Sequence, residues 1–194
     1  TWTLSASSIT LDGAIQVRSI IMDSDGTVYA SVVNTNGGEI YKSDDGTTWQ
    51  KLASAATLGG ASCIDSLLID IAGNIYAAVN GTNIVIYKSS DGGSTWNITA
   101  DAGDLNNPIS LYDLQTDAQG NIYAVVEDND GAAVYWSEDN GGSWSRIADR
   151  YNLGDAPCFY DYHSSLLGTD SSGNIFVASY TEEVYKSADK GSTW

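Results

Sequence analysis

Basic residues are scarce in this sequence, and their scarcity limits the partners that the protein can bind. Eight lysines and arginines stand against 25 aspartates and glutamates, which gives a formal net charge of −17. Nucleic acids and anionic lipids are bound through clustered Lys and Arg side chains. We therefore expect no nucleic-acid partner. Because Asp suits tight turns, we attribute much of the acidic excess to turn residues.

Long apolar runs are absent, and metal-ligating side chains are few. No apolar stretch approaches the roughly 18 residues of a membrane-spanning helix, so we expect no membrane insertion. Histidine occurs once, as His163, and a single histidine without a partner Cys or His is a poor signal for a metal site. We predict no metal and no cofactor.

An internal repeat dominates what is present. An apolar residue, a tyrosine and a phrase close to Ser-x-Asp-x-Gly-x-Thr-Trp recur four times; the first copy, from Ser43, is one residue short, and the third has Ser143 at the Thr position. The tryptophans of the phrase, Trp49, Trp96, Trp144 and Trp194, are 47, 48 and 50 residues apart. A unit of this length is too small to bury its own core and must stack on copies of itself.

A second phrase, Asp-x-x-Gly followed by apolar residues, stands upstream in each repeat at Asp23, Asp70, Asp117 and Asp170. Such clusters between apolar runs predict β-hairpin turns, because Gly and Asn tolerate positive φ. In the second repeat we predict strands near 64–69, 74–79, 84–88 and 95–100. Four short antiparallel strands per repeat predict an all-β propeller built from four-stranded blades. We expect one propeller region over 1–194, with repeats at about 3–49, 50–96, 97–144 and 145–194.

The Ser-x-Asp-x-Gly-x-Thr-Trp phrase resembles the Asp box, or BNR repeat, of sialidases, sortilin-type receptors and xyloglucan-hydrolysing propellers. The resemblance implies a turn in which Ser and Asp accept backbone hydrogen bonds, Gly takes positive φ and Trp packs between sheets. It also implies a structural role away from the binding mouth. The residues so assigned are Ser43, Asp45, Gly46 and Trp49; Ser89, Asp91, Gly93 and Trp96; Ser137, Asp139, Gly141 and Trp144; and Ser187, Asp189, Gly191 and Trp194.

The number of blades is open at this point. The sequence opens on Thr1-Trp2, which echoes the end of a box and favours part of a longer array over a closed ring of four. The two cysteines, Cys63 and Cys158, allow one disulfide, which needs Cα atoms within about 7 Å. That separation suits a narrow four-bladed channel, so the cysteine pair tests the number of blades. From the duplicated box end at Thr1-Trp2, we expect further repeats or domains of a longer parent chain.

Binding residues are expected where the repeats differ, at the mouth of the channel. Five residues before the Asp of each Asp-x-x-Gly turn, the repeats carry Arg18, Asp65, Tyr112 and Ser165, four different chemistries at one position. The neighbouring candidates are Asp113 and the run 159–163 in the longest repeat. The predicted channel-mouth residues are Arg18, Asp65, Tyr112, Asp113, Tyr160, Asp161, Tyr162 and His163. No residue is predicted to be catalytic.

We rank three functions. A non-catalytic extracellular or cell-surface module that binds a glycan or protein, or serves structural assembly, comes first. A glycoside hydrolase comes second, in which two of the three inner-strand carboxylates Asp65, Asp113 and Asp161 supply the acid pair of a xyloglucanase-like enzyme. Sialidase activity fits less well, because the resemblance would require an arginine triad and the chain has only Arg18, Arg146 and Arg150. A photosystem-assembly propeller comes third, since this acidic chain lacks a basic patch.

Overall fold

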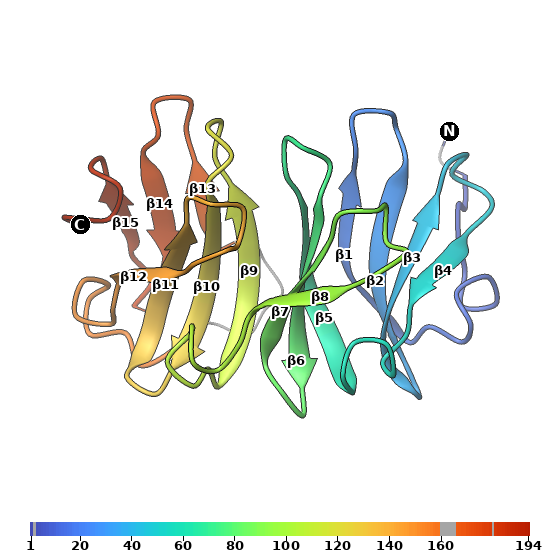
Figure 1. Ribbon diagram of the computed structural model, residues 1–194, viewed down its shortest axis with the longest axis horizontal. Helices are drawn as coiled ribbons and strands as arrows, with labels where there is room; N and C mark the ends of the chain where they lie inside the picture. Colours follow the sequence, from blue (N-terminus) through green and yellow to red (C-terminus); the bar gives the residue numbers. More distant parts are fainter. Residues whose placement is uncertain (2, 160–165, 180) are drawn as a thin grey trace. The chain divides into compact units, whose positions relative to one another are not determined.

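The computed structural model describes residues 1, 3–159, 166–179 and 181–194. All of its regular elements are β-strands, arranged in four antiparallel sheets (Figure 1). Sheet 1 has the order β1-β2-β3-β4, at Gln16–Met22, Val28–Asn34, Gly37–Ser43 and Gln50–Ala53. Sheet 2 has the order β5-β6-β7-β8, at Ala61–Ile69, Ile75–Gly81, Val85–Ser89 and Asn97–Ala100.

Sheets 3 and 4 repeat this meander. Sheet 3 contains β9 to β12, at Ser110–Thr116, Ile122–Asp128, Gly131–Ser137 and Ser145–Ala148. Sheet 4 has three described strands, β13 at Leu167–Thr169, β14 at Ile175–Ala178 and β15 at Val184–Ser187. The predicted all-β architecture of short antiparallel strands is confirmed, whereas the number of blades in a complete ring stays a prediction.

The chain divides into two compact units. The first comprises Thr1–Asn83 and Tyr87–Asn97, and the second comprises Ile84–Ile86 and Ile98–Trp194. Sheet 1 belongs to the first unit, and sheets 3 and 4 belong to the second. In the described part of the chain, no helix has the length and apolar character of a membrane span.

The first two strands of each sheet are joined by the Asp-x-x-Gly turn, as predicted. In sheet 2, Asp70 Oδ1 accepts hydrogen bonds from the backbone N–H groups of Ala72 and Asn74, both at 2.9 Å. Its Oδ2 accepts from Asn74 Nδ2 at 2.7 Å and from the Tyr76 hydroxyl at 3.1 Å. Gly73 takes the positive-φ position, with φ of 82°. One aspartate therefore closes the turn and ties it to the second strand.

Antiparallel connectivity gives each sheet two distinct ends. The first-to-second and third-to-fourth strand connections share one end, which we call the turn end. The second-to-third connection and the loop that leaves the fourth strand share the other, which we call the loop end. The Asp-x-x-Gly turn and the Ser-x-Asp phrase both lie at the turn end, so the two repeated phrases occupy the same end of every sheet.

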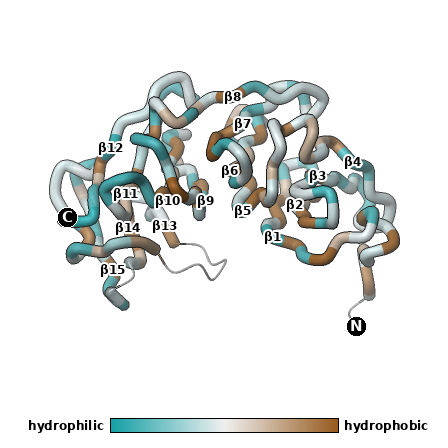
Figure 2. Tube along the Cα trace, turned by 90° about the horizontal axis from the view of Figure 1, so that it is seen from below, coloured by the Kyte–Doolittle hydropathy of each residue, from teal (hydrophilic) through white to brown (hydrophobic). Residues whose placement is uncertain are grey.

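Sheet stacking produces the core in the second unit. The second strand of a sheet is apolar along most of its length, as the hydrophobic segments of Figure 2 show around β10. Residues of sheets 3 and 4, including Val125, Val134, Ile175 and Val177, form one buried cluster, and Trp194 packs against it. Full burial of such side chains stabilises the fold by about 1.5–3 kcal/mol each.

Cys63 and Cys158 are both half-buried and are not joined by a disulfide. The Cys63 thiol donates a hydrogen bond to Asp65 Oδ2 at 3.3 Å. Burial raises the pKa of the Cys158 thiol. The pair therefore gives no cross-link to the fold.

Candidate functional site

The four Ser-x-Asp segments, which we call the Ser-Asp turns, are closed by their own side chains. In the second turn, the Ser89 hydroxyl donates to Asp91 Oδ1 at 2.8 Å and accepts from Gly93 N at 2.8 Å. Asp91 Oδ1 also accepts from Thr95 N at 2.8 Å, and Asp91 Oδ2 accepts from the Thr95 hydroxyl at 2.7 Å. The Thr95 hydrogen bonds, backbone first, lower the pKa of Asp91.

The other turns repeat this arrangement. Asp139 is bonded by Ser137 and Ser143, and Asp189 by Ser187 and Thr193. The first turn is one residue shorter, so Asp45 Oδ1 accepts from two successive backbone groups, Thr47 N and Thr48 N. Each aspartate is committed to its own turn, which leaves it little capacity for a ligand.

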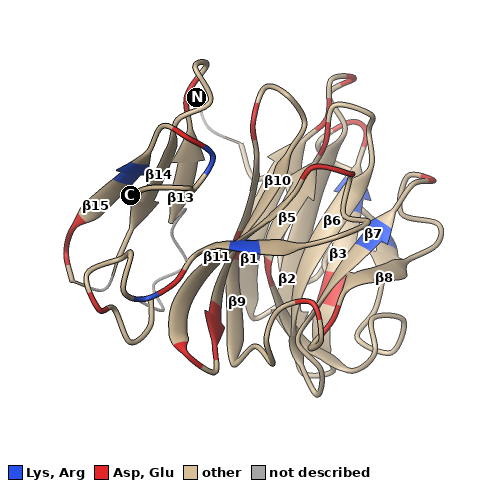
Figure 3. Cartoon of the chain, turned by 60° about the vertical axis from the view of Figure 1, so that its left-hand side comes forward, with Lys and Arg blue, Asp and Glu red and all other residues tan. Residues whose placement is uncertain are grey.

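The tryptophans of the third and fourth turns reach the preceding sheet, whereas Trp96 Nε1 donates to the Gly93 carbonyl of its own turn at 3.1 Å. Trp144 Nε1 donates to the carbonyl of Thr99 at 3.1 Å, and Trp194 Nε1 donates to the carbonyl of Ile147 at 3.0 Å. Thr99 and Ile147 stand at the same position, three residues after the tryptophan of the preceding turn. The turns thus fasten one sheet to the outermost strand of the sheet before it. Figure 3 places acidic residues largely on turns and loops.

The predicted channel-mouth residues of the first unit form an ion pair. Arg18 lies on β1 and Asp65 on β5, and Arg18 NH1 donates to Asp65 Oδ1 at 3.0 Å. The two side chains are 18% and 16% exposed. Asp65 Oδ2 accepts from Asn80 Nδ2 at 2.6 Å as well as from Cys63. The structure brings Arg18 and Asp65 together as a link between neighbouring sheets.

Asp113 in the second unit is buried and holds backbone groups of sheet 4. Its Oδ2 accepts from Leu166 N at 3.0 Å and from Leu167 N at 3.4 Å. Ser19 has the equivalent position in sheet 1, and its hydroxyl accepts from Leu67 N of sheet 2 at 3.1 Å. Asp113 therefore accepts from a backbone N–H group of the next sheet, as Ser19 does at the equivalent position of sheet 1.

Tyr112 points its hydroxyl to Glu127 Oε2 at 2.8 Å, and its ring meets Phe159 edge-on at 5.8 Å. Burial, followed by the Glu127 hydrogen bond, raises the pKa of Tyr112. The remaining candidates, Tyr160, Asp161, Tyr162 and His163, lie outside the described residues.

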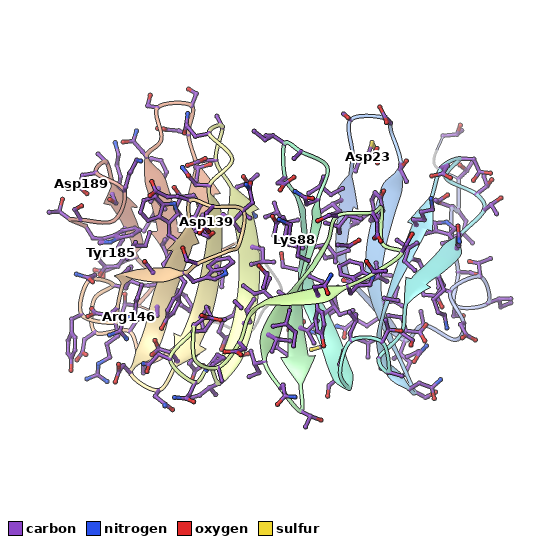
Figure 4. All side chains as sticks on the ribbon, in the orientation of Figure 1. Asp23, Lys88, Asp139, Arg146, Tyr185 and Asp189 are labelled. Carbon is purple, nitrogen blue, oxygen red and sulfur yellow. The ribbon has the colours of Figure 1, made fainter. Side chains whose placement is uncertain are left out.

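A polar pocket that sequence reasoning did not select lies at the loop end of sheet 3. Its volume is about 360 Å³, within the range of small-ligand sites. Residues from the β10–β11 connection, β12 and the loop after β12 line it: Asn129, Asp130, Arg146, Asp149, Arg150 and Tyr151. In Figure 4, Arg146 lies toward the lower end of the sheets of this unit and Asp139 lies well above it.

Arg146 is fixed on one wall of the pocket by two carboxylates. Its NH1 donates to Asp128 Oδ2 at 3.2 Å and to Asp130 Oδ2 at 3.0 Å. The Asp128 side chain is 1% exposed and also accepts from the Tyr135 hydroxyl at 2.7 Å. The hydrogen bond with Asp130, opposed by burial, raises the pKa of Arg146. The guanidinium remains a permanent donor, and the Arg146 side chain is 34% exposed.

Arg150 and Tyr151 form the outer rim. The Arg150 guanidinium carbon lies 4.7 Å from the centre of the Tyr151 ring, in a cation–π arrangement. Arg150 Nε lies 3.1 Å from Asp155 Oδ1. The Tyr151 side chain is exposed, so the pocket offers an aromatic surface beside donors and acceptors.

Part of this network belongs to the scaffold. Lys51 of sheet 1 has the repeat position of Arg146 and bonds Glu39 at 2.9 Å and Asp12 at 2.7 Å. Glu39 accepts from the Tyr41 hydroxyl at 2.7 Å, as Asp128 does from Tyr135. Burial and the Glu39 hydrogen bond raise the pKa of Tyr41 to about 12.

Arg150 and Tyr151 are particular to the segment that follows Trp144. The positions six and seven residues after the tryptophan are Ala55-Ala56 after Trp49 and Ala102-Gly103 after Trp96. This difference was available in the sequence. It was missed because the comparison of repeats was confined to the inner strand and did not extend to the loop after the fourth strand.

Groups of three or more His, Cys, Asp and Glu side chains suited to a metal ion are absent from the described residues. Of the carboxylates that line the pocket, Asp130 is paired with Arg146, and Asp149 Oδ1 accepts from the backbone N–H groups of Tyr151 and Asn152. The arrangement favours recognition of a polar organic group by hydrogen bonds.

The sequence matches the family described as the DUF6242 beta propeller domain over residues 1–194, and the chain belongs to that family. The four meander sheets of the structure are therefore blades of a propeller. A comparison with curated proteins found no match.

Solved structures with the same fold come from varied proteins. A chain of a nidogen–laminin complex is similar with a TM-score of 0.68 and 16% identity, covering 91% of this chain and 62% of that one. YCF48 bound to a D1 peptide is similar with a TM-score of 0.60 and 19% identity, and the match covers 92% of this chain and 52% of that one. A putative gluconolactonase is similar with a TM-score of 0.67 and 14% identity, and the match covers 90% of this chain and 59% of that one. The chain thus spans less than two thirds of each, and these likenesses show the fold alone.

Proposed function

We propose that this propeller is a non-catalytic binding module and that its ligand occupies the pocket at the loop end of sheet 3. The observation that carries the proposal is the exposed Arg150-Tyr151 pair, which stands where the segments after Trp49 and Trp96 have Ala-Ala and Ala-Gly. A scaffold position does not require these two side chains, because sheets 1 and 2 form without them. Large exposed side chains at the rim of a polar pocket instead serve recognition.

The ligand class that fits best is a glycan. Sugar hydroxyls both donate and accept hydrogen bonds, and the pocket presents Asp130 and Asp149 as acceptors and the two arginines as donors. The Tyr151 ring supplies an apolar face for the C–H surface of a sugar ring. Four carboxylates, Asp128, Asp130, Asp149 and Asp155, surround two guanidinium groups, so a neutral glycan is favoured over an anionic one.

Hydrolysis of that glycan is not part of the proposal. A glycosidase needs one carboxyl group that donates a proton and a second that attacks or activates water. Asp65 is held by Arg18, Asn80 and Cys63, and Asp113 is held by two backbone N–H groups of sheet 4. Carboxylates committed to holding sheets together are poorly placed to exchange protons with a substrate.

Glycan binding can be tested with an array of neutral and acidic oligosaccharides, followed by calorimetry on the best binder. Tyr151→Ala should weaken that binding about tenfold or more, because it removes the aromatic surface. Ile71→Ala truncates a comparably exposed side chain at the turn end of sheet 2 and should leave affinity unchanged. Binding that survives Tyr151→Ala undiminished would place the ligand elsewhere.

A protein segment is the second candidate. Two of the similar structures are complexes, one of nidogen with laminin and one of YCF48 with a peptide. A segment with polar and basic side chains would suit the acid-rich rim of the same pocket. Failure of every glycan on the array, together with capture of a peptide that depends on Tyr151, would favour this candidate.

We further propose that the Ser-Asp turns are Asp boxes and that the protein acts outside the cell or at its surface. The side-chain bonding of Ser, Asp and Thr in the turns supports the first proposal. The second rests on composition, since the sequence is acidic, poor in Lys and rich in small polar residues. Fractionation of the source cells, with detection of the chain in the medium or on the surface, tests the location.

A further inference from the structure

One sheet face in the first unit is apolar and uncovered, although its equivalents are buried. Ile20 on β1 is 66% exposed. The residues at the same repeat position on the other inner strands are Leu67, Leu114 and Leu167, which are 3%, 1% and 3% exposed. Val17 is 55% exposed, whereas its equivalents Ile64 and Leu111 are 0% exposed.

Within the first unit, the structure shows what covers this position in sheet 2. Sheet 1 lies over β5: the Ser31 hydroxyl donates to the Ile64 carbonyl at 2.8 Å. A Cβ built on Gly38 would lie 3.1 Å from Ile64 Cγ1, so the backbone of β3 packs directly on that side chain. The cover of an inner strand is therefore the sheet that precedes it in the chain. If the same packing holds for sheet 1, a sheet that precedes it in the chain would cover Val17 and Ile20.

The N-terminal segment already takes the place of the outermost strand of such a sheet. Ser5 stands three residues after Trp2, as Thr99 stands three residues after Trp96. The Ser5 hydroxyl donates to the carbonyl of Gly46 in the first Ser-Asp turn, and the Thr99 hydroxyl donates to the carbonyl of Gly141 in the third. Ser5 thus makes the contact that a preceding outermost strand makes.

The outer half of sheet 1 is covered by this segment, and the inner half is not. Leu11 is buried with Val32 and Tyr41, and Ala6 and Ala14 pack against the same cluster. Ile20 and Met22, nearer the inner edge, remain exposed, at 66% and 64%. A sheet that precedes sheet 1 would have three strands besides the outermost strand, whose place the segment near Ser5 takes. The uncovered area of sheet 1 lies where those three strands would pack.

We propose that the face of sheet 1 around Val17, Ile20 and Met22 is the docking surface for one further blade of the same repeat, encoded on the N-terminal side of residue 1. The similar propellers agree with this occupant, since the chain covers only 52–62% of their length. The fourth blade of the same chain fits less well as the occupant, because it carries its own Thr193-Trp194 and would duplicate Thr1-Trp2. Apolar β-branched and sulfur-containing side chains match the buried faces of such blades.

The test compares residues 1–194 with the protein extended by its native N-terminal sequence, at least one repeat long. Ile20→Lys should leave the Tm of residues 1–194 unchanged, because the side chain is solvated there. In the extended protein the same substitution should lower Tm by about 5 °C or more, because a charge then enters a buried face. Leu67→Lys, at the equivalent buried position, is the control and should lower Tm in both proteins.

Three other results would overturn the proposal. A silent Ile20→Lys in the extended protein means that no upstream blade covers the face. A Tm loss in residues 1–194 that is independent of concentration means that the same chain covers it. Concentration-dependent dimers of residues 1–194 that Ile20→Lys disrupts mean that a second copy is the occupant. None of these results bears on the ligand pocket of sheet 3.

Discussion

Two neighbouring glycines in the second Ser-Asp turn differ in what they tolerate. Gly92 has φ of 69°, and a Cβ added to it would meet nothing within 4 Å. Gly93 has φ of 90°, and its Cβ would lie 2.6 Å from Leu52 Cδ1 of sheet 1. The equivalents of Gly92 in the third and fourth turns are Asn140 and Lys190, both with φ of 57°. Only the Gly93 position is restricted by both conformation and packing.

Gly92→Asn should therefore change the free energy of unfolding by less than about 0.5 kcal/mol, since Asn tolerates the left-handed region. Gly93→Ala should lower it by about 2–4 kcal/mol through backbone strain and overpacking against Leu52. Urea unfolding followed by tryptophan fluorescence measures both. Equal losses in the two variants would show that the contact with Leu52 does not restrict the turn.

The turn aspartates predict the behaviour of the protein in acid. Hydrogen bonds from Thr95, Ser143 and Thr193 lower the pKa values of Asp91, Asp139 and Asp189. A carboxyl whose pKa is lower in the folded than in the unfolded chain stabilises the fold above the unfolded value of about 4. That stability is lost as the pH falls through the folded values.

The urea midpoint should accordingly be nearly constant from pH 7 to about 5 and should fall below about pH 4. Asp91→Asn should flatten the decline between about pH 4 and 2, because one of the titrating groups is removed. Asp44→Asn, on the same kind of turn and paired with Lys42 at 3.8 Å, is the matched control. A midpoint that rises on acidification would contradict the assigned role of these carboxylates.

In sheets 1, 2 and 3, the Asp-x-x-Gly turn is tied to the second strand by a tyrosine hydroxyl. Tyr123 donates to Asp117 Oδ2 at 2.9 Å, and Tyr76 makes the same contact with Asp70. Sheet 4 has Phe176 at this position, so its turn at Asp170 is closed by backbone N–H groups and Asn174 alone. The turn can form without the hydroxyl, but a buried charged group then loses one partner.

Tyr123→Phe should lower the free energy of unfolding by about 1.5–3 kcal/mol, the value of a buried hydrogen bond to a charged acceptor. Tyr151→Phe also removes a hydroxyl, but from an exposed ring, and should have almost no effect on stability. Chemical denaturation of both variants gives the comparison. A neutral Tyr123→Phe would mean that Asn121 and the backbone alone satisfy Asp117.

Turns and strands could be predicted at this scale because their causes are local. Asp70, Gly73 and Asn74 carry the turn within five residues, so the sequence predicts the hairpin and places its strands within a few residues. In sheet 2, the first strand, β5, begins at Ala61, whereas the sequence predicts a start near Ile64. The strand is longer because two register shifts let it pair further along β6. Such irregularities depend on the neighbouring strand and leave no local signal.

At the scale of the whole molecule, the repeat predicted the architecture, but the differences between repeats on the inner strand did not predict the pocket. Arg18, Asp65 and Asp113 differ from their repeat equivalents, yet the structure uses them to join neighbouring sheets. A difference between repeats is therefore not by itself a sign of function. Arg150 and Tyr151 differ as well, and they are exposed at a cavity, which only the folded chain reveals.

The central claim is that the ligand contacts this cavity rather than the Ser-Asp turns. The most direct measurement is the Kd of the best-bound glycan for a double variant, Arg150→Ala with Tyr151→Gly, which installs the Ala-Gly pair of the second repeat. We predict a Kd at least about 100-fold higher with an unchanged Tm, since each lost side chain weakens binding about tenfold. An unchanged Kd would mean that the ligand does not contact this cavity.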